Sequence, residues 1–154
     1  MSVHEKSIIR RAVSADIPAL AEYEREISVI SFGGEAITDL AHHEKRLRKS
    51  MEQDSGGMFV LEKGSAVAGW LWMDMKTNFL TQENYANFRS FYIAENARGG
   101  SEAEALLDFG MEWCREKGAR RVVGKVHAGN APMRALYRKA GFEATHITME
   151  WTHD

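Results

Sequence analysis

The chain has 154 residues, of which 44% are hydrophobic and 27% are charged, and its formal net charge is −2. This length fits a single α/β domain over residues 1–154, and the composition excludes a largely disordered chain. Because the net charge is slightly negative, no global positive field would attract nucleic acid, and we expect no nucleic-acid partner.

The cysteine content and the apolar runs bear on the cellular compartment. Cys114 is the single cysteine, so no intrachain disulfide can form, which suits a reducing compartment. It occupies an apolar position of a predicted helix, and we expect a buried structural thiol there. We find no apolar signal stretch at the N-terminus and no run near the roughly 20 apolar residues of a membrane span. We therefore expect a soluble, cytoplasmic protein without a membrane partner.

The periodicity of the apolar residues predicts the element order β-α-α-β-β-β-α-β-α-β. In the first helix, Ser14 is the expected N-cap and Pro18 falls in the first turn, where a missing N–H is harmless. A hairpin signal at 63–65 joins the second and third strands. The first half is predicted to hold a strand at 7–13, helices at 14–30 and 37–51, strands at 58–62 and 66–75, a loop at 76–86 and a strand at 88–94.

The second half of the chain alternates helices with strands. Gly118 and Gly141 each follow a predicted helix, in the position where a left-handed C-cap is favoured. Together with the first half, these elements predict a mixed sheet with helices on its faces, an α/β (α+β) fold. The predicted elements here are helices at 101–117 and 131–140, a strand at 121–126, and one or two closing strands at 142–151.

The segment from Ala97 to Glu104 links a predicted strand to a helix start. Free backbone N–H groups converge at such a junction, and the helix dipole favours negative charge there. Gly99 and Gly100 would let the backbone approach a phosphate closely. A Gly-Gly turn before a helix more often only connects two elements and binds no ligand. The lysine of a phosphate-binding Walker loop is missing.

This turn resembles the pyrophosphate-binding motif of the GNAT acetyltransferases, Arg/Gln-x-x-Gly-x-Gly/Ala, which here reads Arg98-x-x-Ser101-x-Ala103. Ser101 stands where the family usually has glycine, and Ser101 with Glu104 also fits a capping box. Glu102 and Glu104 bring negative charge that should weaken pyrophosphate binding. The resemblance implies that the turn holds the pyrophosphate of acetyl-CoA through Arg98, Gly99, Gly100, Ser101, Glu102, Ala103 and Glu104.

Residues 130–142 are very similar to a second GNAT signature, an Asn seven residues before a Tyr in a helix that ends in Gly-Phe. Asn130 can cap this helix, and seven residues are two turns, so Tyr137 returns to the same face. The resemblance implies that Asn130 meets the pantetheine arm or an associated water. It also implies that Tyr137 protonates the departing CoA thiolate. The alternative for Tyr137 is a core aromatic with its hydroxyl at the surface.

The resemblance covers nearly the whole chain and implies a single-domain GNAT fold. Its sheet would have 6–7 mostly antiparallel strands and would splay between the strands ending near Ile93 and Val126. The enzyme would move an acetyl group directly from acetyl-CoA to a primary amine, and because the family commonly dimerises, a homodimer is a candidate assembly. Backbone groups of the cofactor-bearing strand would bind the acetyl carbonyl and pantetheine, at Phe91, Tyr92 and Ile93.

The acceptor side follows from the same resemblance. An aromatic wall with a few acids suits a cationic, partly apolar amine, which slightly favours a small-molecule acceptor over a protein N-terminus or lysine. Filling of the core and of a dimer face is an equally good explanation for the aromatic residues between 70 and 72. The residues expected to line the pocket are Phe32, Glu35, Trp72, Asp74 and Tyr85.

The general base of the reaction is not assigned by the sequence. Some family members have a glutamate where this chain has Lys125, which cannot accept a proton while charged. Candidates that remain are Glu35, Asp74, Glu83 and His127. A non-catalytic acyl-CoA-binding module is therefore the competing function. No metal site is expected, because adjacent histidines at 42 and 43 point to different helix faces and no His-Glu-x-x-His spacing occurs.

Overall fold

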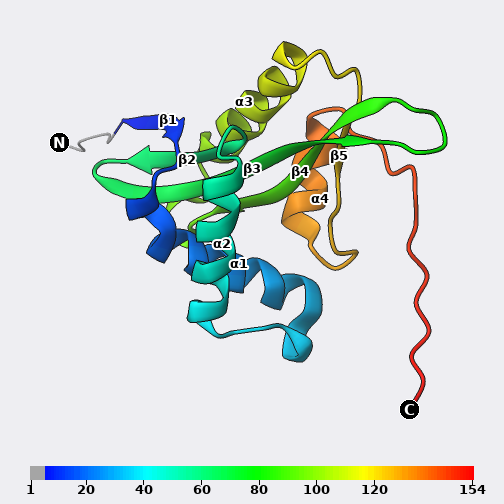
Figure 1. Cartoon of the computed structure of the whole chain (residues 1–154), viewed down its shortest axis with the longest axis horizontal. Helices are drawn as coiled ribbons and strands as arrows, with labels where there is room; N and C mark the ends of the chain where they lie inside the picture. Colours follow the sequence, from blue (N-terminus) through cyan, green and yellow to red (C-terminus); the bar gives the residue numbers. More distant parts are fainter. Residues whose placement is uncertain (1–5) are drawn as a thin grey trace.

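The computed structural model of the chain describes residues 6–154, which form a five-stranded sheet with helices on both faces (Figure 1). The strands are β1 (Ser7–Arg11), β2 (Met58–Lys63), β3 (Ala66–Thr77), β4 (Asn84–Ile93) and β5 (Val122–Gly124). The helices are α1 (Ile17–Phe32), α2 (Leu40–Gln53), α3 (Glu102–Glu116) and α4 (Ala131–Lys139), with short 3-10 turns at Ser14–Asp16, Gly33–Glu35 and Glu95–Ala97. The sheet order is β1-β2-β3-β4-β5, with antiparallel neighbours except that β5 runs parallel to β4.

Side-chain alternation along β3 divides the core between the two faces of the sheet. Trp70 and Trp72 point to one face, where they pack with apolar residues of α1 and α2. Leu71 and Met73 point to the other face, where they join a cluster with apolar residues of α3 and α4. Figure 1 shows α1 and α2 on the side of the sheet opposite α3. The middle of β3 is thus buried on both faces, which explains its nearly continuous apolar sequence.

A partly buried ion-pair network fixes the chain before α1. Arg10 of β1 donates to both carboxylate oxygens of Asp16 at 2.9 Å and to Glu62 of β2 at 2.6 Å. Asp16 is 6% exposed and also accepts a hydrogen bond from the Val13 N–H at 2.8 Å. The Arg10 guanidinium holds the pKa of the Asp16 carboxyl below its usual range. The predicted capping role of Ser14 is therefore wrong, because the Asp16 carboxylate satisfies the backbone there.

Two predicted segments differ from the structure. Residues 142–151 contain no strand, so the sheet has five strands and the expected 6–7 is wrong. Their alternating sequence is that of a strand, but no other part of residues 6–154 pairs with it. Residues 76–86 are not a long loop, because β3 and β4 extend into them and pair up to Thr77 and Asn84. Asn78 closes the short connection, since its side-chain oxygen accepts from the Leu80 N–H at 2.9 Å.

The C-terminal ends of α3 and α4 agree with the sequence. Gly118 and Gly141 have φ angles of 77° and 93°, the left-handed conformation that favours glycine after a helix. Cys114, near the end of α3, is 2% exposed and its thiol donates to the Ala119 carbonyl at 3.3 Å. Burial raises the pKa of this thiol. The prediction of a buried structural cysteine is confirmed.

Candidate active site

The sheet opens between β4 and β5. These two strands pair only where Ala86–Phe88 lies against Val122–Gly124. A bulge at Arg89 then shifts the register of β4 against β3, and β4 continues to Ile93. Along this stretch the edge of β4 that faced β5 has no strand partner among the described residues, so its backbone groups can serve a ligand. The expected splay between strands ending near Ile93 and Val126 is confirmed.

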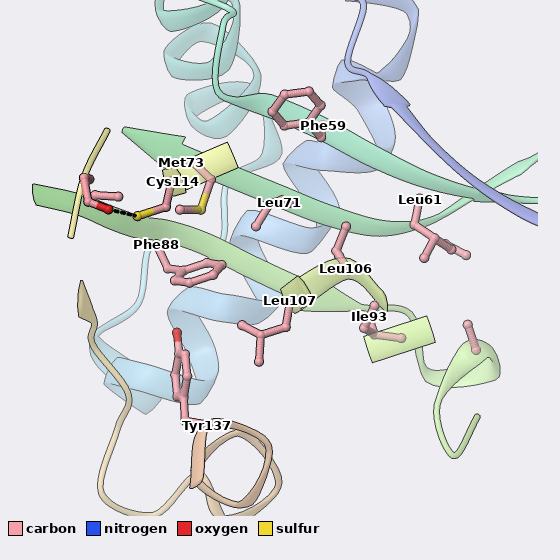
Figure 2. Packing of buried hydrophobic residues seen from close by; sticks show 14 residues of the cluster. Phe59, Leu61, Leu71, Met73, Phe88, Ile93, Leu106, Leu107, Cys114 and Tyr137 are labelled. Atoms are coloured by element: carbon pink, nitrogen blue, oxygen red, sulfur yellow. Dashed lines mark hydrogen bonds between the residues drawn. The ribbon is translucent and has the colours of Figure 1, made fainter. Parts of the chain in front are cut away.

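Tyr137 projects from α4 toward this opening. Figure 2 shows its ring below Phe88, with the hydroxyl oxygen pointing toward the sheet. The ring centre lies 6.1 Å from that of Phe88 and 4.8 Å from that of Phe142. The hydroxyl reaches Gly124, the last paired residue of β5, where a Cβ atom would overlap it. The side chain therefore ends where the two strands part.

Burial favours the protonated form of the Tyr137 hydroxyl. The residue is 7% exposed, and burial raises the pKa of its phenol well above the ordinary value. No hydrogen bond joins the hydroxyl to another group within residues 6–154. Since no sealed polar side-chain atom in that range lacks a partner, the hydroxyl must retain contact with solvent.

Asn130 caps α4 as the sequence predicts. Its Oδ1 accepts from the Met133 N–H at 3.3 Å, and its backbone carbonyl accepts from the Arg134 N–H at 3.1 Å. Pro132 lies in the first turn, where its missing N–H leaves no intrahelical bond unmade. The cap fixes the start of α4 two turns before Tyr137 and so contributes to placing the tyrosine.

The turn before α3 closes against the end of β4. Gly99 has a φ of 88°, which a residue with a side chain rarely adopts. Arg98 folds back, so that its Nε donates to the Ile93 carbonyl at 2.9 Å. Its guanidinium carbon lies 5.2 Å from the centre of the Tyr92 ring. The predicted pyrophosphate turn and the predicted cofactor strand are therefore joined directly.

The start of α3 lacks the predicted capping box. Ser101 occupies the N-cap position, but its side chain makes no capping hydrogen bond. Glu104 pairs instead with Lys139 of α4, which explains why it does not turn back toward the backbone of Ser101. Leading N–H groups of α3 are consequently left for another acceptor, as an anion site requires.

Glu102 places a carboxylate at the mouth of this turn. It accepts from Lys63, at the end of β2, at 2.9 Å, and its side chain is 13% exposed. The same carboxylate would overlap a Cβ atom at Gly100, so it lies against the backbone of the turn. The hydrogen bond from Lys63, followed by one from its own N–H, lowers the pKa of Glu102. The Glu102 carboxylate thus occupies part of the turn that is predicted to bind the pyrophosphate.

Three of the predicted acceptor residues share one face of β3 and β4. By strand alternation, Trp72, Asp74 and Tyr85 face the side that carries α1 and α2. Trp72 is 5% exposed, and the Arg89 guanidinium lies 3.8 Å from the centre of its ring. Asp74 accepts from Asn87 at 3.0 Å and lies 3.9 Å from Arg89. Arg89 therefore covers the tryptophan face expected to meet a cationic amine.

The other two predicted acceptor residues lie outside the sheet. Phe32 ends α1 and is 65% exposed. Glu35 is exposed in the 3-10 turn that follows. α1 runs two residues beyond the predicted end at residue 30 and is followed by Gly33.

Comparison with known proteins decides the family. Residues 19–142 match the family model described as the acetyltransferase (GNAT) family. The chain belongs to the GNAT acetyltransferase family. It is accordingly an enzyme, and the competing non-catalytic module loses its support.

Two relatives and one solved structure illustrate the likeness. A candidate alanine N-acetyltransferase for ribosomal protein bS18, from Bacillus subtilis, is 28% identical over 97% of this chain and 89% of its own length. The structure of a ribosomal-protein-alanine N-acetyltransferase from Brucella melitensis is 29% identical, covers 88% of this chain and 84% of its own, and has a TM-score of 0.70. A mycothiol acetyltransferase from Saccharomonospora viridis is 27% identical over 70% of this chain, which spans 37% of that relative's length.

Glu24, which no sequence pattern singled out, ties α1 of this GNAT domain to the strands beside the opening. Its Oε1 accepts from the Trp70 indole N–H at 3.0 Å and from the Ser90 hydroxyl at 2.6 Å. Ser90 directly follows the bulge in β4. A signal existed, because Glu24 lies four residues after Leu20 and three before Ile27 and so shares their apolar helix face.

Lys63 and Arg89 were likewise not singled out by any sequence pattern. Each acts through a contact between residues far apart in the chain, Lys63 with Glu102 and Arg89 with Trp72. Local patterns cannot reveal such contacts, because they depend on strand register.

The contacts of the remaining candidate bases, and of Lys125, do not assign the general base. Glu83 pairs with Arg121 at 3.1 Å. The Nδ1 atom of His127 accepts from the Gly129 N–H at 3.0 Å. Lys125 is exposed.

Two further observations concern metals and membranes. Within residues 6–154, no group of three or more His, Cys, Asp or Glu side chains could hold a metal ion together. In the same part of the chain, no helix combines the length and apolar character needed to cross a bilayer.

Proposed function

We propose that this GNAT enzyme transfers the acetyl group of acetyl-CoA directly to a primary amine, in the opening between β4 and β5. The observation that carries the proposal is the Tyr137 hydroxyl, which ends where these strands part, beside Gly124. A protonated phenol beside an unpaired strand edge supplies an acid next to backbone groups that can hold a thioester.

Binding of the donor would use the turn before α3 and the free edge of β4. The N–H groups at the start of α3 suit the pyrophosphate, since they are backbone donors at the positive end of a helix dipole. The unpaired groups after Arg89 suit the acetyl carbonyl and the amides of pantetheine. Arg98 connects the two regions through its bond to the Ile93 carbonyl.

The transfer needs one acid and one base. The neutral amine attacks the thioester carbonyl, the tetrahedral intermediate expels the CoA thiolate, and Tyr137 donates its phenolic proton to that sulfur. The amine nitrogen loses a proton to water or to a base, and the phenolate regains one from solvent. Because burial raises the pKa of Tyr137, the phenol stays protonated throughout the neutral range. Tyr137 therefore carries its phenolic proton before each turnover.

Two classes of acceptor amine remain. The aromatic and acidic sequence pattern slightly favours a small-molecule amine, although Arg89 already covers the Trp72 ring and pairs with Asp74. The relatives named for ribosomal-protein alanine, which match most of this chain, favour a protein N-terminus. A panel of polyamines, amino acids and amino sugars, compared with peptides that begin with alanine, would separate these classes by kcat/KM.

The Tyr137→Phe substitution tests the proposed acid. Phenylalanine keeps the ring contacts with Phe88 and Phe142, so folding should be unchanged. We expect kcat to fall by roughly 10²–10⁴-fold, the usual contribution of a general acid, while the Kd for CoA stays the same. Tyr23→Phe is the matched control, because it removes a phenol that only bonds the Val67 carbonyl. If Tyr137→Phe turns over like the control, Tyr137 is not the acid.

A further inference from the structure

Arg89 is the extra residue of the bulge in β4. The register of β4 against β3 shifts at this residue, so Arg89 has no opposite residue in β3. A bulge redirects a side chain, and bulges are common beside active sites. The Arg89 side chain lies on the face of the sheet that carries α1 and α2, with its guanidinium carbon 3.8 Å from the centre of the Trp72 ring. This stacking holds the charge in place.

The guanidinium donors of Arg89 are free for a ligand. They form no hydrogen bond within residues 6–154, and their ion pair with Asp74 is long, at 3.9 Å. Since no sealed polar side-chain atom in that range lacks a partner, these donors must reach solvent, and the side chain is 36% exposed. A guanidinium presents its donors as a planar fork that fits both oxygens of a carboxylate. A fixed fork without hydrogen bonds is therefore suited to bind such a group.

The charges around Arg89 favour an additional anion. Burial, followed by the nearby Arg46 of α2, lowers the pKa of Arg89, although Asp74 and Glu24 act in the opposite direction. Because these two carboxylates do not restore the ordinary pKa, a bound carboxylate would stabilise the charged guanidinium further. Arg46 is exposed, so its side chain can turn toward the same ligand.

Arg89 also lies beside the place where the acetyl group would be transferred. It directly follows Phe88, the last residue of β4 that pairs with β5. Tyr137 comes to this place from the face that carries α3 and α4, whereas Arg89 lies on the opposite face, which is left for the acceptor. On that opposite face Glu24 bonds Ser90, the next residue of β4, at 2.6 Å, and its Oε2 accepts no hydrogen bond from residues 6–154. A cation and an anion thus lie close together on the acceptor side.

We propose that Arg89 binds a carboxylate of the acceptor, so that the acceptor is an amine with a carboxylate a few bonds away, as in an α-amino acid. This inference rests on the proposed acetyl transfer, because it names the substrate class of the same site. The carboxylate accepts hydrogen bonds from the Arg89 fork, and the amine end lies toward Glu24. An acceptor with an uncharged amide instead would leave the fork without its anion and bind less well. A free amino acid and a peptide with an acidic second residue both supply this chemistry.

The test compares acceptors that differ only in the carboxylate. One arm pairs the free amino acids alanine and phenylalanine with their amides, and the other pairs alanyl-glutamate amide with alanyl-glutamine amide. We expect the wild type to have a kcat/KM roughly 10–100-fold higher for the carboxylate member of one arm, the usual effect of hydrogen bonds to a charged group. The arm that shows this preference identifies the source of the carboxylate.

The Arg89→Met substitution removes the fork and keeps an apolar chain over Trp72. It should lower kcat/KM for the carboxylate acceptors roughly 10–100-fold, through KM, and change the amides by no more than about twofold. Amides have less basic amines, but this difference cancels in the ratio of wild type to variant. Arg115→Met is the matched control, because it removes an exposed arginine from α3 that pairs with Glu112. A structural role of Arg89 would instead lower both members of each pair equally.

Three results would overturn the proposal. The first is a ratio of wild type to Arg89→Met that is the same for carboxylates and amides in both arms. The second is a wild type that acetylates amides or polyamines but no amine with a carboxylate, in which case the proposed acetyl transfer still stands. The third is no turnover of any amine, with which the proposed transfer fails too. If circular dichroism shows that Arg89→Met does not fold, Arg89→Lys replaces it and should give a smaller loss, again confined to the carboxylate acceptors.

Discussion

Replacing Glu102 with glutamine removes one negative charge from the mouth of the turn before α3. The carboxylate lies against Gly100 and is paired with Lys63 at 2.9 Å, so the substitution also frees the lysine charge. If the pyrophosphate of acetyl-CoA binds at this turn, it must share the site with this anion. We therefore expect Glu102→Gln to tighten the binding of CoA.

The magnitude follows from Coulomb's law. Two unit charges about 5 Å apart repel by roughly 0.8 kcal/mol in bulk water and by about 3 kcal/mol at an effective dielectric constant of 20. Glu102 is 13% exposed, so its environment lies between these limits. We expect a gain of about 1.4 kcal/mol, which lowers the Kd for CoA about tenfold. The gain should shrink as salt concentration rises, because salt screens the repulsion.

Isothermal titration of CoA into each variant measures the effect. Glu112→Gln is the matched control, because it removes the same charge from the same helix, where Glu112 pairs with Arg115 at 2.9 Å. Ten residues further along α3, it lies about 15 Å from Glu102. Lys63→Met should have the opposite sign and weaken binding. Equal Kd values for Glu102→Gln and Glu112→Gln would refute the placement of the pyrophosphate at this turn.

Two other substitutions probe the opening and the fold. Gly124→Ala would drive a methyl group into the Tyr137 hydroxyl, so kcat should fall at least about tenfold with little change in the Kd for CoA. Steady-state kinetics checks this, and an unchanged kcat would contradict it. Asp16→Asn should lower the free energy of unfolding by about 1–3 kcal/mol at pH 7. Because Arg10 lowers the native pKa of Asp16, that contribution is present above the ordinary carboxyl pKa of about 4 and is lost as the pH falls through the lowered native pKa. Urea unfolding should therefore show the gap narrowing as the pH falls below about 4.

Local sequence signals predicted the parts of the fold that local physics controls. The glycines at 118 and 141 end helices because the left-handed C-cap favours glycine, and Asn130 caps α4 because its side chain reaches its own helix start. The splay was expected only through family resemblance, and the register of β4 against β5 then confirmed it. The spacing of apolar residues placed every helix and every strand to within a few residues, and the largest errors are at the starts of α1, α2 and β4.

Signals that depend on distant contacts failed. Ser101 and Glu104 have the spacing of a capping box, but Lys139 of α4 takes the Glu104 carboxylate. Residues 142–151 alternate like a strand, yet a strand also needs a neighbour, and residues 6–154 supply none to them. The acceptor role of Trp72 stays a prediction, and the sequence pattern did not reveal that Arg89 lies over its ring. In each case the partner comes from an element that the local pattern does not contain.

The buried thiol of Cys114 has a practical consequence for studying turnover. Free CoA carries a reactive thiol. The one protein thiol, that of Cys114, is 2% exposed and donates a hydrogen bond to the Ala119 carbonyl. Burial raises its pKa, so its thiolate fraction is small. A thiol-reactive dye added to the native enzyme should therefore report the released product without a protein background. In denaturant the same dye should count unfolded molecules, one label for each chain. The burial of one side chain thus permits a product assay without protein background and provides a probe of global unfolding.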